Sequence, residues 1–136
     1  MIQTLSHTTI YVLDQEAARR FYVEKLGFEV RADMTMGEFR WLTVSPKAQP
    51  NLQMILMPLG ASPAMASATA DALKKLVQAG AMGCGILETD DCQGTYEQLQ
   101  KQGVKFRTPP TQRPYGVEAV MLDDSGNWFS LVQRPR

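Results

Sequence analysis

The chain has 136 residues, 44% of them hydrophobic, and its 14 Lys and Arg balance its 14 Asp and Glu. The balanced charge, without long runs of one sign, excludes nucleic acids and anionic membranes as expected partners and leaves a small organic molecule or a second copy of the chain. There is no apolar run of 18 residues and no signal-peptide pattern, so we expect neither membrane insertion nor export. Two cysteines do not make a disulfide framework, and we predict a cytoplasmic protein. The length predicts a single domain over residues 1–136.

The first half of the chain predicts a strand, a helix and three further strands. Residues 5–12 alternate between two faces, as in a strand. Asp14 is a suitable N-cap for a helix whose apolar positions recur at helical spacing, and Gly27 is suited to end it. The three strands that follow are predicted at residues 28–33, 39–44 and 52–57, with a turn at 36–38.

A change of composition separates the two halves. Residues 59–80 are rich in Ala, Ser, Gly and Pro, and predict a linker followed by a short amphipathic helix. The second half then repeats the first, with a strand, a helix starting at Asp91 and three strands, predicted at 83–88, about 91–103, 104–107, 117–122 and 128–133. A proline-rich loop, 109–116, is expected before the strand at 117–122.

Together these elements predict an α+β fold of two tandem βαβββ units, about 1–58 and 81–136, related by a pseudo-two-fold axis in an open, cup-shaped mixed sheet. The two halves also align residue by residue. His7 aligns with Cys84 and Gln53 with Ser130, each 77 positions later. If the halves fold alike, these four side chains occupy equivalent places facing one cleft.

The tandem pattern, a His in the first strand, and the segments FYVEKLGFEV, ETDDC and PYGVEAVMLDDSGNWFSLVQ resemble the vicinal oxygen chelate superfamily. This superfamily includes glyoxalase I, bleomycin resistance proteins and extradiol dioxygenases. The resemblance covers nearly the whole chain and implies the paired-unit fold. It does not define a reaction, because this fold carries unrelated chemistries.

The resemblance also implies where a divalent metal would bind. Enzymes of the superfamily hold it between the paired units through a His, a Glu, a second His and a second Glu, and the matching residues here are His7, Gln53, Cys84 and Ser130. The set contains no carboxylate, and only His7 is a strong ligand of the expected type. We therefore expect a degenerate metal site and no cofactor, with an atypically held divalent metal as the alternative.

Strand alternation predicts that the cleft is a mostly apolar wall with a few hydrogen-bonding groups, as in a small-molecule pocket. The expected ligand-binding residues are His7, Thr9, Tyr11, Trp41, Gln53, Ile55, Cys84, Ile86, Tyr115, Trp128 and Ser130. Several have alternative interpretations. Trp41 and Trp128 also suit a core or an interface, Cys84 suits a small buried group, and His7 suits a hydrogen bond to a neighbour such as Gln53.

Two functions follow from these residues, and the sequence leaves open whether a reaction is catalysed. The first is a homodimeric small-molecule binding protein that takes up a partly apolar ligand, in the manner of drug-sequestering resistance proteins. The alternative is a lyase, isomerase or dioxygenase-type enzyme that uses an atypical metal site of His7, Gln53 and Glu88, or no metal. Glu88 is the candidate for a displaced ligand or a general base, but it equally fits a solvated strand end.

Overall fold

The helices and strands of the protein follow the predicted order. The computed structural model describes residues 1–60, 62 and 64–136, so Ala61 and Pro63 of the predicted linker lie outside the described residues. In chain order the elements are β1 (His7–Val12), α1 (Gln15–Arg20), η1 (Phe21–Lys25), β2 (Glu29–Met36), β3 (Phe39–Ser45), β4 (Gln53–Pro58), α2 (Ser67–Gln78), β5 (Gly83–Glu88), α3 (Cys92–Lys101), β6 (Phe106–Arg113), β7 (Gly116–Leu122) and β8 (Trp128–Gln133). No helix in these residues is long and apolar enough to span a membrane.

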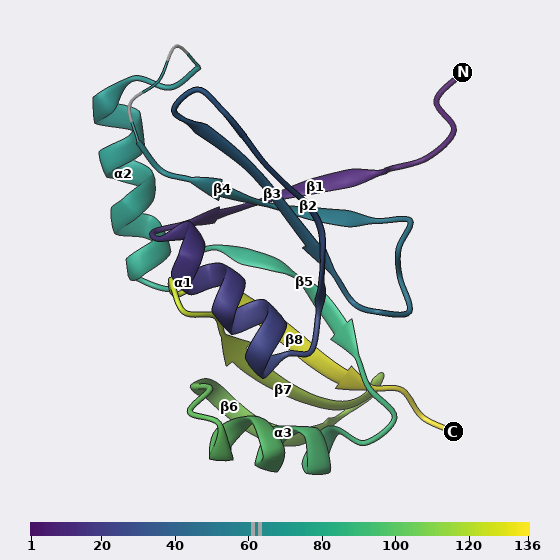
Figure 1. Ribbon diagram of the computed structural model, residues 1–136. Helices are drawn as coiled ribbons and strands as arrows, with labels where there is room; N and C mark the ends of the chain where they lie inside the picture. The colour runs from purple at the N-terminus through teal and green to yellow at the C-terminus, as the bar shows by residue number, and fades with distance from the viewer. Residues whose placement is uncertain (61, 63) are drawn as a thin grey trace. The chain divides into compact units, whose positions relative to one another are not determined.

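The chain divides into two compact units, residues 1–74 and 75–136. Each contains a four-stranded mixed sheet, and the strand order is the same in both, β1-β4-β3-β2 and β5-β8-β7-β6 (Figure 1). β1 is parallel to β4 and β5 is parallel to β8, whereas the other neighbours are antiparallel. The predicted α+β fold of two similar βαβββ units is confirmed. That the two units form one domain stays a prediction.

The first helix begins and ends where the sequence predicts. The Asp14 carboxylate accepts a hydrogen bond from the backbone N–H of Ala17 at 3.0 Å, and Gly27 has the positive φ of +75° that favours glycine after a helix. The helical segment packs against β4 and β2. Its buried residues include Ala18 and Tyr22, and the buried apolar residues of the strands include Ile10, Val12, Leu42, Val44 and Leu56. The sheet face away from α1, here called the distal face of the first sheet, carries a separate set of side chains.

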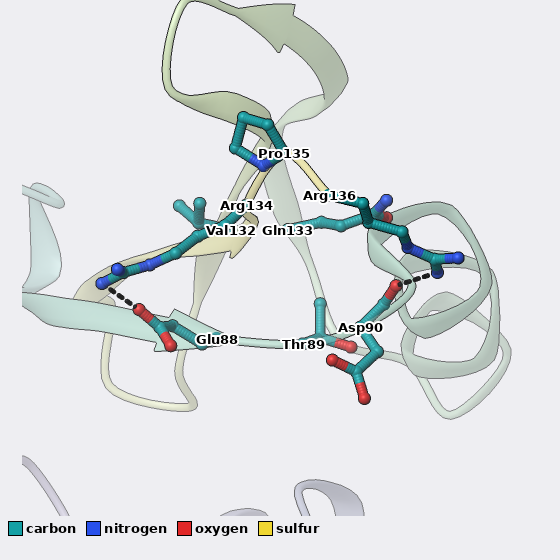
Figure 2. A pocket seen from close by; sticks show the side chains of 8 residues that line it. All are labelled: Glu88, Thr89, Asp90, Val132, Gln133, Arg134, Pro135 and Arg136. Carbon is teal, nitrogen blue, oxygen red and sulfur yellow. Dashed lines mark hydrogen bonds and ion pairs between the residues drawn. The ribbon is translucent and has the colours of Figure 1, made fainter.

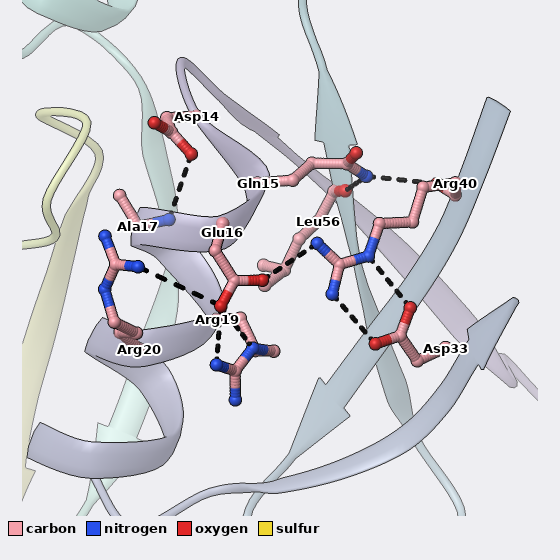
Figure 3. Close-up of polar contacts among 9 residues, drawn as sticks. All are labelled: Asp14, Gln15, Glu16, Ala17, Arg19, Arg20, Asp33, Arg40 and Leu56. Atoms are coloured by element: carbon pink, nitrogen blue, oxygen red, sulfur yellow. Dashed lines mark hydrogen bonds and ion pairs between the residues drawn. The ribbon is translucent and has the colours of Figure 1, made fainter. Parts of the chain in front are cut away.

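A charged network ties α1 to β2 and β3 (Figure 3). Arg40 donates to Glu16 at 3.0 Å and to both carboxylate oxygens of Asp33 at 2.8 Å. Hydrogen bonds from Arg19 and then from Arg40 lower the pKa of Glu16 to about 2. Gln15 adds two hydrogen bonds to backbone carbonyl groups of β3 and β4. These paired charges link α1 to the sheet.

The second unit repeats this construction with α3. Asp91 caps the helix by accepting a hydrogen bond from the backbone N–H of Gly94 at 2.9 Å. α3 packs against β6, β7 and β8, and Cys92, Ala119 and Leu131 form a buried cluster between them. The face of this sheet away from α3 is the distal face of the second sheet.

The main difference from the predicted elements is β6. The sequence predicted a short strand at 104–107 and a loop at 109–116, but the strand continues to Arg113 through Pro109 and Pro110. β6 lies at the edge of the sheet, and in the described part of the chain its one neighbouring strand is β7. On its outer side the prolines therefore interrupt no strand pairing, although they lack N–H groups. The pairing register shifts around the prolines, which accommodates them.

Candidate functional site

The distal face of the first sheet carries the first part of the predicted site. In the parallel pair of β1 and β4, His7 lies opposite Gln53 and Thr9 lies opposite Ile55. Paired residues project on the same side of a sheet, so the structure brings these four side chains together. Tyr11 and Met57 form the next pair along the same face.

Hydrogen bonds and ring contacts fix the polar side chains of this face. The buried Thr43 hydroxyl donates to Gln53 Oε1 at 2.6 Å. His7 is hydrogen-bonded to a neighbour, but the partner is Ser6 and not Gln53, with 2.9 Å between His7 Nδ1 and Ser6 Oγ. The His7 ring instead lies beside the Trp41 ring, with 6.0 Å between the centroids and 50° between the planes. Gln53 is thus held in place by Thr43, and the two rings form an aromatic wall.

Three apolar side chains of this face were missed by the sequence analysis. β2 continues to Met36, three residues beyond its predicted end, so Met34 lies opposite Trp41 and Met36 lies opposite Phe39. Met34 and Met36 are both 55% exposed and Phe39 is 38% exposed. The period-two spacing of the methionines was the signal that could have placed them on a strand.

A pocket of about 700 Å³ opens in the first unit beside the turn between β2 and β3 and the end of β4. This volume lies within the range of small-molecule sites. The residues that line the pocket are Met36, Glu38, Phe39, Met57, Pro58, Leu59, Gly60, Ser62 and Ala64. Met36, Phe39 and Met57 belong to the same distal face as Trp41. The pocket therefore continues the apolar wall that the sequence predicted.

A β-bulge changes the expected arrangement in the second unit. The register of β5 and β8 shifts between Gly83 and Gly85, which places Ile86 opposite Ser130. Cys84 therefore does not take the place opposite Ser130 that His7 takes opposite Gln53, and this part of the repeat alignment is corrected. Gly85 has a φ of +153°, a conformation that glycine adopts readily and that suits a bulge.

Burial controls the chemistry of Cys84. Desolvation, with a smaller contribution from the negative charge of Asp123, raises the pKa of the Cys84 thiol to about 12. The thiol lies 3.8 Å from the backbone carbonyl oxygen of Met82. It is therefore protonated at neutral pH, and a protonated thiol is a poor nucleophile.

We expect slow alkylation of Cys84 by iodoacetamide at pH 8. A pKa of about 12 in place of the ordinary ~8.5 lowers the thiolate fraction, so the rate should be roughly a thousandfold lower than in the urea-unfolded chain. Peptide mass spectrometry locates the label and separates Cys84 from the buried Cys92. A rate within tenfold of the unfolded chain would contradict the expected protection.

Trp128 is held by contacts within its own unit. A Cβ atom on Gly83 would lie 2.4 Å from the indole ring, so the ring rests directly on the glycine backbone. The Arg107 guanidinium lies 5.8 Å from the ring centroid. These contacts support the interpretation of Trp128 as a packing aromatic.

Glu118 is a charged residue of the distal face of the second sheet that the sequence analysis missed. It lies opposite Val132, and its side chain is only 16% exposed. Tyr115 Oη donates a hydrogen bond to Glu118 Oε1 at 2.6 Å. This bond is the main cause that lowers the pKa of Glu118, and Ser130 and the positive charge of Arg113 lower it further. Its alternation with the buried Ala119 was the available sequence signal.

A second pocket, of about 380 Å³, lies at the ends of β5 and β8 and is lined mainly by polar and charged residues (Figure 2). Arg134 forms an ion pair with Glu88, and Arg136 donates to the backbone carbonyl of Asp90 at 3.2 Å. The Glu88 side chain is exposed. Its surroundings are those of a solvated strand end, the alternative interpretation that the sequence offered.

Residues 4–131 match the model of the Glyoxalase/Bleomycin resistance protein/Dioxygenase superfamily. The chain belongs to this superfamily. The uncharacterized protein YurT of Bacillus subtilis (strain 168) is 37% identical to this chain over 128 residues, which are 93% of this chain and 96% of YurT. UcmS2, for which a crystal structure exists, is 50% identical in sequence to this chain, and the two structures match with a TM-score of 0.92. The match covers 98% of this chain and 99% of UcmS2. TnmS3, an antibiotic binding protein from Streptomyces sp. CB03234, is 30% identical with a TM-score of 0.77 and covers 98% of both chains.

The superfamily's metal-binding positions carry donors here that do not fit a divalent cation. Gln53 offers only a neutral amide oxygen, which already accepts from Thr43, and Ser130 offers only a neutral hydroxyl. Ile86 and not Cys84 lies opposite Ser130. His7 alone is a strong neutral ligand, and one imidazole is too few for the metals that the superfamily uses. Over the part of the chain that the structure describes, no three His, Cys, Asp or Glu side chains gather as a metal site requires.

Proposed function

We propose that the protein binds a small, partly apolar organic molecule at the distal face of the first sheet, without a metal. The observation that carries this proposal is the pocket of about 700 Å³ beside Met36, Phe39 and Met57. Thioether and phenyl side chains adapt to flat or irregular apolar surfaces, and placed polar groups orient a ligand. The similarity to TnmS3, which is named as an antibiotic binding protein, supports the same use here.

The apolar side chains give the pocket its expected affinity. Met34, Met36 and Phe39 expose apolar area that a ligand would remove from water, at about 25 cal/mol for each Å². The His7 and Trp41 rings offer an aromatic surface next to them. A ligand with a flat apolar part would use both features, whereas a small charged ligand would use neither.

We also propose that the protein works in the cytoplasm as a homodimer. Ile86 is 67% exposed and Leu76 is 47% exposed, and neither lines the pocket. Apolar side chains of this kind are commonly covered in a symmetric pair of chains. Sedimentation velocity of the samples used for the binding measurements should show a dimer. A monomer at micromolar concentration would contradict the proposed dimer.

Calorimetric titration with bleomycin, 1-naphthol and an aromatic acyl ester tests the binding function. At least one probe should bind, and Phe39→Ala should weaken its binding about tenfold, because a buried aromatic contact contributes roughly 1.4 kcal/mol. Val30→Ala is the matched control, since Val30 is 39% exposed and lies outside the pocket. We expect its affinity to be unchanged.

Three outcomes would contradict the proposal. No binding by any of the probes would refute the binding function, and equal losses in Phe39→Ala and Val30→Ala would refute the assigned pocket. If EDTA abolished binding and a divalent ion restored it, the metal-dependent enzyme alternative would replace a metal-free binding protein.

A further inference from the structure

We propose that Glu38 recognises charge in the pocket of the first unit, and that the bound molecule carries a positively charged amino group next to its apolar part. This inference rests on the proposed binding function and narrows the ligand from any partly apolar molecule to an amphiphilic amine. All the residues that line this pocket belong to the first unit.

A tight turn places Glu38 in the lining of the pocket. β2 and β3 are joined by Gly37 and Glu38 alone, and the residues on either side of this turn, Met36 and Phe39, lie opposite each other in the sheet. Gly37 has a φ of +62°, which suits the first position of a type II′ hairpin turn. Because so short a turn leaves its backbone few conformations, Glu38 stays next to the thioether and the phenyl ring that line the same pocket.

The carboxylate of Glu38 is the only charged group among the described residues that line the pocket. Within residues 1–60, 62 and 64–136, its side chain forms no hydrogen bond or ion pair. Arg31 and Arg40, the two arginines of the same hairpin, form ion pairs with other carboxylates. The negative charge of Glu38 is therefore available to a ligand.

A ligand that fills the pocket takes water away from the Glu38 carboxylate. This loss of hydration costs free energy unless an opposite charge or a hydrogen-bond donor replaces the water. An ammonium group does both, and the ring of Phe39, which is 38% exposed, offers it a cation–π contact as well. A ligand carboxylate in the same place would be repelled, so the pocket should select ligands by charge as well as by apolar surface.

The test compares two probes that share a naphthalene ring and differ in charge, the cation 1-naphthylmethylamine and the neutral 1-naphthalenemethanol. In calorimetric titrations at neutral pH and low salt, the protein should bind the amine about fivefold more tightly, because ion pairs and cation–π contacts at accessible sites are modest in strength. In Glu38→Gln the preference should fall below about twofold, while the affinity for the alcohol stays unchanged. Glu24→Gln is the matched control and should keep the preference, because Glu24 is also exposed but is not among the residues that line the pocket.

Reversing the charge gives a second readout. In Glu38→Lys the order should invert, so that the amine binds more weakly than the alcohol. A preference for the amine that survived in Glu38→Gln, or equal affinity of the two probes for the unmodified protein, would overturn the inference alone. No binding of either probe to the unmodified protein would overturn the proposed function with it. Circular dichroism verifies that each variant is folded.

Discussion

Replacing Asp123 by alanine should lower the free energy of unfolding by about 3 to 5 kcal/mol. Asp123 Oδ1 accepts hydrogen bonds from the backbone N–H groups of Ser125, Gly126 and Asn127, each at 2.9 Å. Its Oδ2 accepts a further one from Asn127 Nδ2 at 3.0 Å. Because Asp123, Ser125 and Asn127 are buried, water cannot fully replace the lost acceptor. The turn between β7 and β8 would lose most of its internal bonds.

Urea unfolding followed by circular dichroism measures this loss. Asp123→Asn is the matched control, because its amide oxygen can still accept the three backbone hydrogen bonds. Its loss in the free energy of unfolding should be less than half of the loss in the alanine variant. If the alanine variant unfolded within about 1 kcal/mol of the unmodified protein, the turn would not depend on this side chain.

Replacing Gly116 by alanine should lower the free energy of unfolding by about 3 kcal/mol or more. Gly116 has a φ of +134°, which side-chain-bearing residues rarely adopt, and a Cβ atom there would lie 2.1 Å from the carbonyl oxygen of Gln133. Backbone atoms cannot move aside as a flexible side chain can. The substitution therefore separates the start of β7 from the end of β8.

Differential scanning calorimetry should show the melting temperature of Gly116→Ala lowered by roughly 10 °C. Gly60→Ala is the control, because no heavy atom lies within 4 Å of the Cβ position there and its φ is not in the left-handed region. The control should melt within about 2 °C of the unmodified protein. Equal melting temperatures for the two variants would refute the steric argument.

The sequence predicted the elements well where one residue determines the local structure. Asp14 and Asp91 both cap helices as expected, and Gly27 ends the first helical segment. The prediction failed for β6, because Pro109 and Pro110 indicate a loop unless the strand is known to lie at a sheet edge. That position depends on tertiary pairing, which local patterns do not contain.

The candidate site was predictable only as far as the strands keep their register. His7 and Gln53 lie side by side as the repeat implied, since β1 and β4 pair without interruption. Cys84 was misplaced because β5 and β8 pair two positions away from the register that the repeat implied, and the bulge between Gly83 and Gly85 accounts for one of those two positions. Glu118 was missed because its partners, Tyr115 and Ser130, come from a turn and a neighbouring strand.

Each sheet has one side packed against its own helix and one side turned away from it. In the first sheet, the buried Leu42 and Val44 therefore alternate along β3 with positions of the distal face, where Phe39 and its neighbours Met34 and Met36 on β2 are exposed. A directed-evolution library that varies Met34, Met36 and Phe39 would leave the packed side intact. We therefore expect such a library to change which molecules are bound at small cost in stability.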